Sequence, residues 1–368
     1  MKNRNIDGVL SEITATYLRQ DGNIPWIVSY SGGKDSTAML ILVWKALVAL
    51  PKDQRLRAVY VVTNDTLVEN PVVAHYVQCA LRNIATEAAK SDLPITTHYT
   101  KPDLKNDFLV KVIGRGYPVP NYRFRWCVDR LKISPTMQFI KSTVDSNGAV
   151  VCLIGARKSE SAHRAQTMGK HGSDAQLLSK HPKCAKAFVF APLRNLSLEE
   201  VWFVINAYKA PWDPTNKLFE IYRDASADDY ECPTVSSAGK GTCGSSRFGC
   251  WCCTVVKRDK SLSAQIDNGQ DWLIPLLKLR DSMVTDRDVE AYRTDTFRNG
   301  NSAVINGRNR GYYTLEYRKK LLSDVIAADI KMKELNPNVA PLMTHERQAL
   351  IAKLWQADQE PTQPATTI

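Results

Sequence analysis

The residues best suited to chemistry form a glycine-rich loop near the N-terminus. An apolar run at residues 26–30 leads into the loop, which reads Ser31-Gly32-Gly33-Lys34-Asp35-Ser36. Its two glycines allow a tight turn that leaves backbone N–H groups open, and the helix expected to follow adds the positive end of its dipole. With the lysine ammonium and the serine hydroxyls, these groups predict a phosphate-binding loop.

The loop differs from the common nucleotide-binding patterns. A G-x4-G-K-[ST] loop needs Gly at position 28 and Ser or Thr at position 35, where this chain has Val28 and Asp35. A carboxylate inside a phosphate loop repels bare phosphate, so we interpret Asp35 as a ligand to Mg²⁺ that bridges the phosphates. The alternative is a plain glycine turn in which Asp35 only caps the helix.

A second set of reactive side chains lies in a cysteine-rich loop at residues 231–253. Four of its thiols have the spacing C-x10-C-x6-C-x2-C, at Cys232, Cys243, Cys250 and Cys253. Four thiolates suit a [4Fe–4S] cluster or Zn²⁺. The stretch has no His and no second C-x-x-C pair, which favours the iron–sulfur cluster over zinc. Cys252 is an alternative fourth ligand, but the C-x-x-C spacing favours Cys253.

Residues 111–141 form a basic segment that also carries aromatic side chains. Asp129 is its one acidic residue, against seven basic ones: Lys111, Arg115, Arg123, Arg125, Arg130, Lys132 and Lys141. Such a segment suits a polyanion, although charge alone does not identify the anion. A solvated helix face is the alternative.

Cys127 lies inside this basic segment. The neighbouring cations are expected to lower its pKa and favour the thiolate. Cys127 is therefore a candidate to carry or receive sulfur as a persulfide, or to be a ligand of the cluster. A buried, inert cysteine is the alternative.

The elements that position these residues follow from the hydrophobic pattern. Apolar, β-branched runs recur with helix-length segments between most of them, at residues 26–30, 58–63, 95–99, 149–154 and 187–190. Strands that alternate with helices predict a parallel sheet covered on both faces, in an α/β domain at residues 1–210. Beyond it the strand signal stops, and residues 211–356 predict a mainly helical domain that contains the cysteine loop, followed by a disordered tail at 357–368.

Composition limits the class of protein. The chain has 49 Lys and Arg against 38 Asp and Glu, a formal net charge of +11, with 44% hydrophobic and 24% charged residues. These values predict a folded chain. No apolar run is long enough to span a membrane and no secretory signal is present, so we expect a cytoplasmic protein with no membrane partner. Five of its nine cysteines lie within residues 232–253, which favours metal or redox use over a disulfide framework.

Several motifs together resemble a known family. The sequence S-G-G-K-D-S after a strand resembles the signature of the PP-loop ATP pyrophosphatases. Three further elements resemble the PAPS reductase branch in the same order along the chain: Asp65-Thr66 with Glu69, Gly155-Ala-Arg157 with Glu160 and Arg164, and Pro192-Leu193 with Trp202. The cysteine loop with Arg247-Phe-Gly-Cys250-Trp is similar to that of DndC-type sulfurtransferases, the PP-loop component of the Dnd and Ssp systems of DNA phosphorothioation.

The resemblance implies a fold and a reaction. The α/β domain would be an adenine-nucleotide-binding, HUP-like domain that uses ATP, Mg²⁺ and a [4Fe–4S] cluster. ATP would activate a DNA backbone phosphate by adenylation with loss of pyrophosphate, and sulfur would replace a non-bridging oxygen. The basic segment at residues 111–141 would then be the DNA-binding surface. A partner cysteine desulfurase would supply the sulfur, alongside other phosphorothioation proteins of an anti-phage, restriction-type system.

The resemblance also implies roles for individual residues. Catalytic roles fall to Lys34, Asp35, Cys127 and Arg157. ATP-binding roles fall to Ser31, Gly32, Gly33, Lys34, Asp35, Ser36, Asp65, Gly155, Arg157 and Arg164. Two alternatives remain: a reductase of adenylylsulfate or its 3′-phosphate, and a nucleotide-sensing DNA-binding module without turnover.

Overall fold

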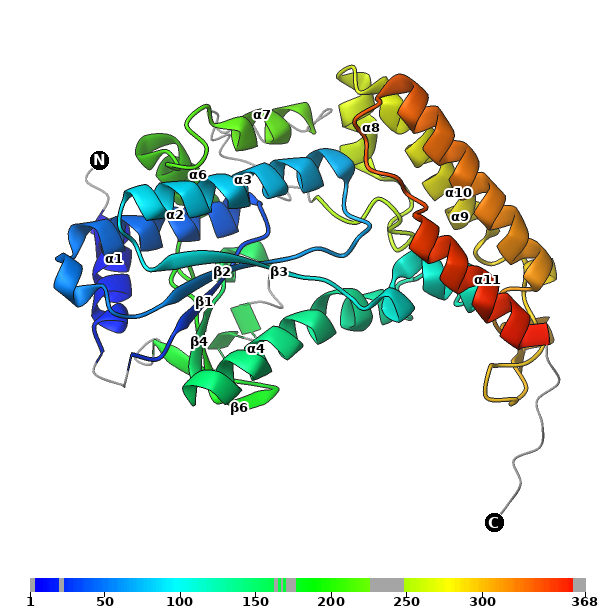
Figure 1. Ribbon diagram of the computed structural model, residues 1–368, viewed down its shortest axis with the longest axis horizontal. Coiled ribbons are helices and arrows are strands. Elements are labelled where there is room, and N and C mark those ends of the chain that lie inside the picture. The colour runs from blue at the N-terminus through cyan, green and yellow to red at the C-terminus, as the bar shows by residue number, and fades with distance from the viewer. Residues whose placement is uncertain are drawn as a thin grey trace, which may run out of the picture.

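The structure is a computed structural model that describes residues 4–19, 23–161, 165–166, 168–169, 177–225 and 248–359. Its centre is a six-stranded sheet with the order β3-β2-β1-β4-β6-β5. The parallel strands are β1 (Trp26–Ser29), β2 (Val59–Asn64), β3 (Ile95–Thr100), β4 (Val150–Leu153) and β6 (Cys184–Phe190). The predicted parallel α/β fold, followed by a mainly helical region, is confirmed (Figure 1).

One strand of the sheet was not predicted. β5 (Leu178–His181) pairs antiparallel with β6 at the sheet edge. Its sequence, Leu-Ser-Lys-His, holds no β-branched or aromatic residue apart from the half-polar histidine, so the strand pattern is missing. An edge strand needs only one paired side, and backbone pairing to β6 is enough to form it.

Alternating side chains of the strands build a core on each face of the sheet. On β1, Trp26 and Val28 join the larger core, whereas Ile27 joins the smaller one. Helices α1 (Arg4–Tyr17), α2 (Lys34–Ala49), α3 (Pro71–Lys90), α6 (Leu198–Tyr208) and α7 (Lys217–Asp224) contribute to the larger core. Helix α4 (Ser134–Asn147) covers the other face.

Helix α2 is the central element of the larger core. Most of its side chains are buried, which explains why its sequence is apolar nearly all round. It starts directly after Gly33 and ends before Pro51, which cannot continue the helix. The rigid position of α2 fixes the glycine-rich loop at the carboxyl end of β1.

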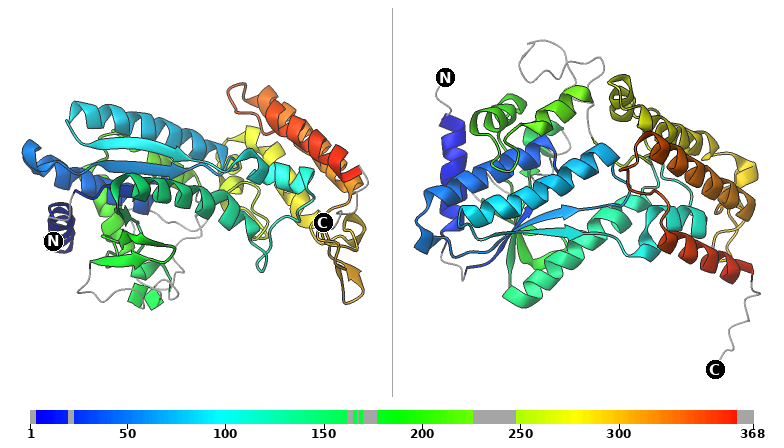
Figure 2. Two further views of the ribbon diagram at one scale, coloured as in Figure 1. Left: turned by 60° about the horizontal axis from the view of Figure 1, so that its bottom comes forward. Right: turned by 45° about the horizontal axis from the view of Figure 1, so that its top comes forward.

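Apart from the two faces of the sheet, the C-terminal helices share a core of their own, which we call the second core. Its helices are α8 (Lys260–Asp267), α9 (Ile274–Asp286), α10 (Leu315–Leu335) and α11 (His345–Gln359). In both views of Figure 2 these helices lie beside the sheet. The segment between β3 and α4 leaves the sheet to join them, through the π-helical turns Val110–Gly114 and Val128–Ile133. The described part of residues 211–356 is mainly helical, as predicted.

The region after residue 211 also contains a short β-hairpin that was not predicted. Its strands β7 (Val304–Ile305) and β8 (Arg308–Asn309) pair antiparallel. The turn Asn306-Gly307 explains it, since both residues have positive φ.

None of the described helices has the length and apolar character of a membrane span.

Candidate functional site

The glycine-rich loop has the backbone geometry of an anion cradle. Gly32 has φ +72°, and a Cβ built there would lie 2.3 Å from Cγ2 of Val77 on α3, so only glycine fits. Gly33 is the N-cap of α2 and has no side chain to cap the helix. The Ser36 hydroxyl donates to the Gly33 carbonyl at 2.9 Å and accepts from the Ser31 N–H at 3.2 Å, which holds the loop closed.

The loop after β4 packs directly on the first turn of α2. A Cβ on Gly155 would lie 3.0 Å from the Asp35 carbonyl carbon, so a side chain there would push the two loops apart. Two residues further on, the buried Arg157 donates from Nε to Oδ1 of Asp35 at 2.6 Å. Lys34 Nζ lies 3.9 Å from the other oxygen of Asp35. The structure thus brings the predicted residues Lys34, Asp35, Gly155 and Arg157 into one cluster.

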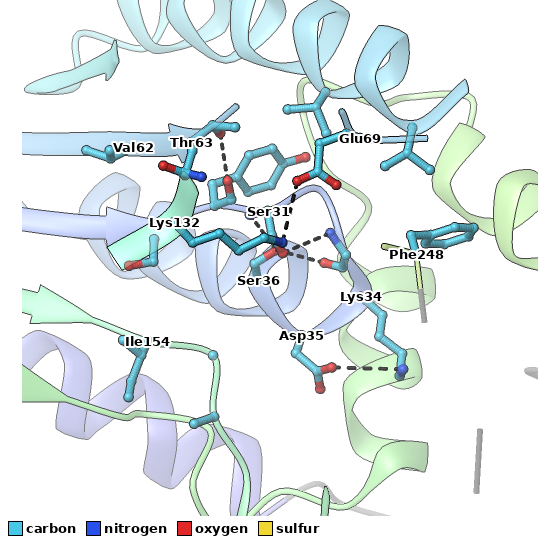
Figure 3. A pocket seen from close by; sticks show the side chains of 18 of the residues that line it. Ser31, Lys34, Asp35, Ser36, Val62, Thr63, Glu69, Lys132, Ile154 and Phe248 are labelled. Carbon is cyan, nitrogen blue, oxygen red and sulfur yellow. Dashed lines mark hydrogen bonds and ion pairs between the residues drawn. The ribbon is translucent and has the colours of Figure 1, made fainter. Parts of the chain in front are cut away.

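These residues line a cavity of 1110 Å³ at the carboxyl ends of the parallel strands (Figure 3). Ligands of open α/β sheets bind in this position. The Asp35 side chain remains 24% exposed, so its carboxylate can still reach a cation that also binds phosphate oxygens. The cradle, Lys34 and Asp35 therefore fit a nucleoside triphosphate with Mg²⁺.

Tyr222 and Phe248, from segments distant from the loop in the sequence, pack beside Lys34. The Tyr222 hydroxyl on α7 accepts from the Lys34 N–H at 3.2 Å, and the Lys34 ammonium lies 5.3 Å from the ring centroid. Phe248 packs edge-on against this ring at 4.8 Å. The sequence carried no signal for Tyr222, because a tyrosine on a short amphipathic helix looks like an ordinary core residue.

The loop after β2 forms a second wall of the cavity. Asp65 accepts from the Leu67 N–H at 2.8 Å, and burial raises the pKa of its carboxyl despite that hydrogen bond. Leu67 takes φ +62°, which turns the chain sharply. Thr66 then donates to Glu69 at 2.8 Å, so the carboxylate of Glu69 is held at the cavity.

The end of the cysteine loop docks on this wall. Cys250 and Glu69 form an antiparallel bridge, and the Trp251 N–H donates to the Val68 carbonyl at 3.0 Å. The Cys250 thiol lies 3.5 Å from Oγ1 of Thr66 and 4.0 Å from Oε1 of Glu69. Lys132 Nζ lies 3.5 Å from the same Glu69 oxygen. Burial, with the carboxylate of Glu69, raises the pKa of Cys250 to about 12.

The prediction that cations would lower the pKa of Cys127 is wrong. Burial raises it, the nearby Cys253 raises it further, and Lys132 offsets only part of this. The reason is position: Cys127 packs against the core of the helical region instead of facing solvent among the cations. Cys127 lies close enough to Cys250 and Cys253 for their charges to interact.

The predicted metal site is described only in part. Cys232 and Cys243 lie outside the described residues, as does Arg164 of the ATP-binding set. Among the residues that are described, no group of His, Cys, Asp or Glu forms a metal-ligand set. Cys252 is buried in the second core, whereas Cys253 is partly exposed. Cys79 on α3, Cys152 on β4 and Cys184 on β6 lie apart from this group.

Solved structures show only partial likeness to this chain. Phosphoadenylyl-sulfate reductase from Candida auris has a TM-score of 0.34 at 13% identity, over 59% of this chain and 92% of that one. The U34-tRNA thiolase NcsA from Methanococcus maripaludis, solved with its [4Fe–4S] cluster, has 0.34 at 14%, over 78% and 80%. The NH3-dependent NAD synthetase from Campylobacter jejuni has 0.35 at 14%, over 77% and 95%. TM-scores this low do not establish a shared fold.

Sequence comparison gives the stronger result. The uncharacterized protein MJ0066 of Methanocaldococcus jannaschii is 30% identical over 199 residues, which cover 53% of this chain and 34% of that protein. The chain thus spans about a third of the length of this relative. The sequence profile described as "Phosphoadenosine phosphosulfate reductase domain" matches residues 25–256, which is more than half of the chain. The protein therefore belongs to the phosphoadenosine phosphosulfate reductase domain family.

Proposed function

We propose that the protein is an ATP pyrophosphatase and sulfurtransferase that introduces phosphorothioates into DNA. One observation carries the proposal: a single cavity has a phosphate cradle on one wall and the thiol of Cys250, with Glu69 and Lys132, beside the other. ATP activation and sulfur delivery need these two kinds of group within reach of one substrate atom. DNA as the substrate, and the link to the Dnd or Ssp systems, rest on the resemblance of the cysteine loop.

The reaction would proceed in two substitutions. A non-bridging DNA phosphate oxygen attacks the α-phosphorus of ATP, and pyrophosphate leaves. A persulfide sulfur then attacks the activated DNA phosphorus, and AMP leaves with the original oxygen. A second thiol cleaves the S–S bond, so one disulfide forms for each phosphorothioate. Mg²⁺, when bound with the nucleotide, supplies charge neutralisation on the phosphates.

The residues of the chain have separate parts in this scheme. The α2 amides and Lys34 stabilise negative charge on the leaving pyrophosphate. Arg157 holds Asp35 in a fixed orientation through their short ion pair. The described cysteines do not complete a ligand set, so we assign no step to a cluster. We propose a cysteine desulfurase as the persulfide source, further phosphorothioation proteins as partners, and the cytoplasm as the site of action, where ATP and DNA are present.

The family match favours one second candidate, reduction of adenylylsulfate or its 3′-phosphate. The two reactions leave different products. The sulfurtransferase releases pyrophosphate from ATP, whereas the reductase releases sulfite from its sulfonucleotide; both reactions oxidise thiols, so pyrophosphate and sulfite are the products that distinguish them. Measurement of pyrophosphate with ATP and DNA, and of sulfite with the sulfonucleotide and a thiol, separates the two reactions. Release of neither product identifies a binding module without turnover.

The decisive experiment is mass spectrometry of nuclease-digested DNA. Cells would carry the intact gene, a deletion, or Asp35→Asn, which removes the charge but keeps an oxygen acceptor for Arg157. Asp35→Ala would instead leave the buried guanidinium without its carboxylate. Phosphorothioate dinucleotides only with the intact gene would support the proposal, and their absence from expressing cells would reject it.

A further inference from the structure

A turn at residues 121–125 presents an exposed aromatic and basic surface. The Tyr122 side chain is 79% exposed and the Phe124 side chain 44% exposed, although such rings are usually buried. Arg123 and Arg125 are exposed beside them. The Arg125 guanidinium lies 5.0 Å from the centroid of the Tyr122 ring. No described carboxylate forms an ion pair with either arginine, so the turn carries a net positive charge.

Hydrogen bonds within the turn and from Thr254 hold it in one conformation. Oδ1 of Asn121 accepts from the Arg123 and Phe124 N–H groups, both at 2.9 Å, and the Asn121 N–H donates to the Phe124 carbonyl. Thr254 donates to the Pro120 carbonyl at 2.5 Å. The exposed rings therefore do not result from a loose loop, and binding to them costs little ordering of the backbone.

A cluster of cations lies around Tyr117, which contacts Trp126, the residue that follows the turn. Tyr117, whose ring lies 5.4 Å from that of Trp126, has Lys111 Nζ at 5.2 Å and the Arg130 guanidinium at 5.8 Å from its centroid. Burial, followed by repulsion from Arg130 and Arg115, lowers the pKa of Lys111 to about 8. The cations thus repel one another without enough neighbouring acids, as expected where an anion binds.

We propose that this surface, the 121–125 turn with Lys111, Arg115 and Arg130, binds a nucleic-acid strand with unpaired bases. Tyr122 and Phe124 are stacking platforms for bases, and the cations hold the phosphates. In a duplex the base faces are stacked on each other, so two protruding rings would have nothing to stack on. The proposal rests on the proposed function for DNA as the acceptor, and it adds that the target nucleotide is presented unpaired.

The position of the surface suits this role. The π-helical turn Val128–Ile133 begins three residues after Arg125, and it carries Lys132 to the lining of the cavity. Between the turn and Lys132 the chain carries Arg130 and the exposed Asp129. A strand bound over the 121–125 turn thus lies only a few residues along the chain from the cavity lining. Single-stranded nucleic-acid sites commonly combine a path of positive charge with aromatic platforms.

Fluorescence anisotropy of the full chain tests the proposal. The probes are a labelled single-stranded DNA, the duplex of the same sequence, the matching single-stranded RNA, and a polyglutamate peptide. The double variant Tyr122→Ala/Phe124→Ala removes both rings. Phe203→Ala on α6, where the ring is 45% exposed, is the matched control.

We expect the double variant to bind the single strand about 100-fold more weakly, roughly tenfold for each ring, with an unchanged salt slope. Duplex affinity should change little, and Phe203→Ala should bind as the wild type does. Lys111→Gln/Arg115→Gln should reduce the slope of log affinity against log salt by about 0.7 for each charge removed.

Three results would overturn the inference: unchanged single-strand affinity in the ring variant, an equal loss for duplex, or binding of polyglutamate as tight as that of the single strand, which would indicate an acidic protein partner. Preference for RNA over DNA would keep the strand site and reject DNA as the acceptor. Pyrophosphate release from ATP is measured separately. Its absence from the wild type in the presence of single-stranded DNA would reject the proposed function. Ring variants that need about 100-fold more single-stranded DNA for the same pyrophosphate release, with an unchanged rate at saturating DNA, would support the inference.

Discussion

Removal of the Arg347 side chain should destabilise the protein more than any surface substitution. Arg347, in the first turn of α11, donates from Nε and Nη2 to Oδ2 of Asp107 at 3.0 and 2.5 Å. Asp107 is fully buried and Arg347 is 6% exposed. The arginine also donates to the carbonyls of Leu342 and Leu67. Arg347 thus ties the C-terminal helix to the loop after β2.

The magnitude follows from burial. Breaking a buried ion pair by removing one partner costs about 3–5 kcal/mol, because the other charge stays buried and uncompensated. Arg347→Met keeps the aliphatic volume and should therefore lower the free energy of unfolding by about 4 kcal/mol. In the double variant with Asp107→Asn no buried charge remains, and the amide oxygen still accepts from the Leu109 and Val110 N–H groups. We expect it to recover about 2 kcal/mol, since two carbonyls still lack their donor.

Urea unfolding of the four proteins of this cycle measures the effect. Lys90→Met serves as the control, because Lys90 forms an exposed pair with Glu87 and should change stability by less than about 0.5 kcal/mol. The same variants report on the site: the loop that Arg347 holds carries Asp65 and Glu69, so the KM for ATP should rise in Arg347→Met. A loss of stability below about 1 kcal/mol, or a double variant no more stable than the single one, would refute the reasoning.

Three further predictions address the loop, the metal ligand and the cation cluster. Gly32→Ala should lower the unfolding free energy by at least about 1–2 kcal/mol, because a Cβ suits neither φ +72° nor the contact with Val77; thermal unfolding measures it. Asp35→Asn should abolish pyrophosphate release while circular dichroism stays unchanged, and near-normal release would remove Asp35 from the catalytic set. Lys111 has its pKa lowered from 10.5 to about 8, so the unfolded chain binds more protons between these values and stability should rise with pH there. Lys111→Met should flatten this rise in urea titrations across that range.

The parts of the site that lie together in the sequence were predictable. The glycine-rich loop, β1 and α2 are contiguous, so local pattern and turn chemistry fix them together. The residues of the second wall were not predictable as a group. Cys250 and Glu69 are far apart in the chain, and the isolated backbone bridge that joins them has no sequence pattern. Likewise, nothing in the sequence pairs Asp107 with Arg347.

The basic segment shows why charge and composition alone could not locate a surface. Its residues were predicted as one DNA-binding unit, yet Trp126 and Leu131 pack into the second core, and Trp126 stacks on Phe108. Helical periodicity does not separate the two groups, because the segment contains π-helical turns and a tight turn instead of a regular helix. Only the folded structure separates the buried rings from the exposed ones.

The loop after β2 connects the cavity at the sheet with the second core of the C-terminal helices. Its residues Asp65 and Glu69 line the nucleotide cavity, its Val68 belongs to the second core, and Arg347 of α11 holds its Leu67 carbonyl. Hydrogen bonds tie this short loop within itself, from Leu67 to Asp65 and from Thr66 to Glu69, and its Val68 carbonyl accepts from Trp251. Displacement of the C-terminal helices would therefore change the nucleotide wall and the position of Cys250 at once. Under the proposed function, Arg347→Met should therefore weaken ATP binding and displace the segment of Cys250 together.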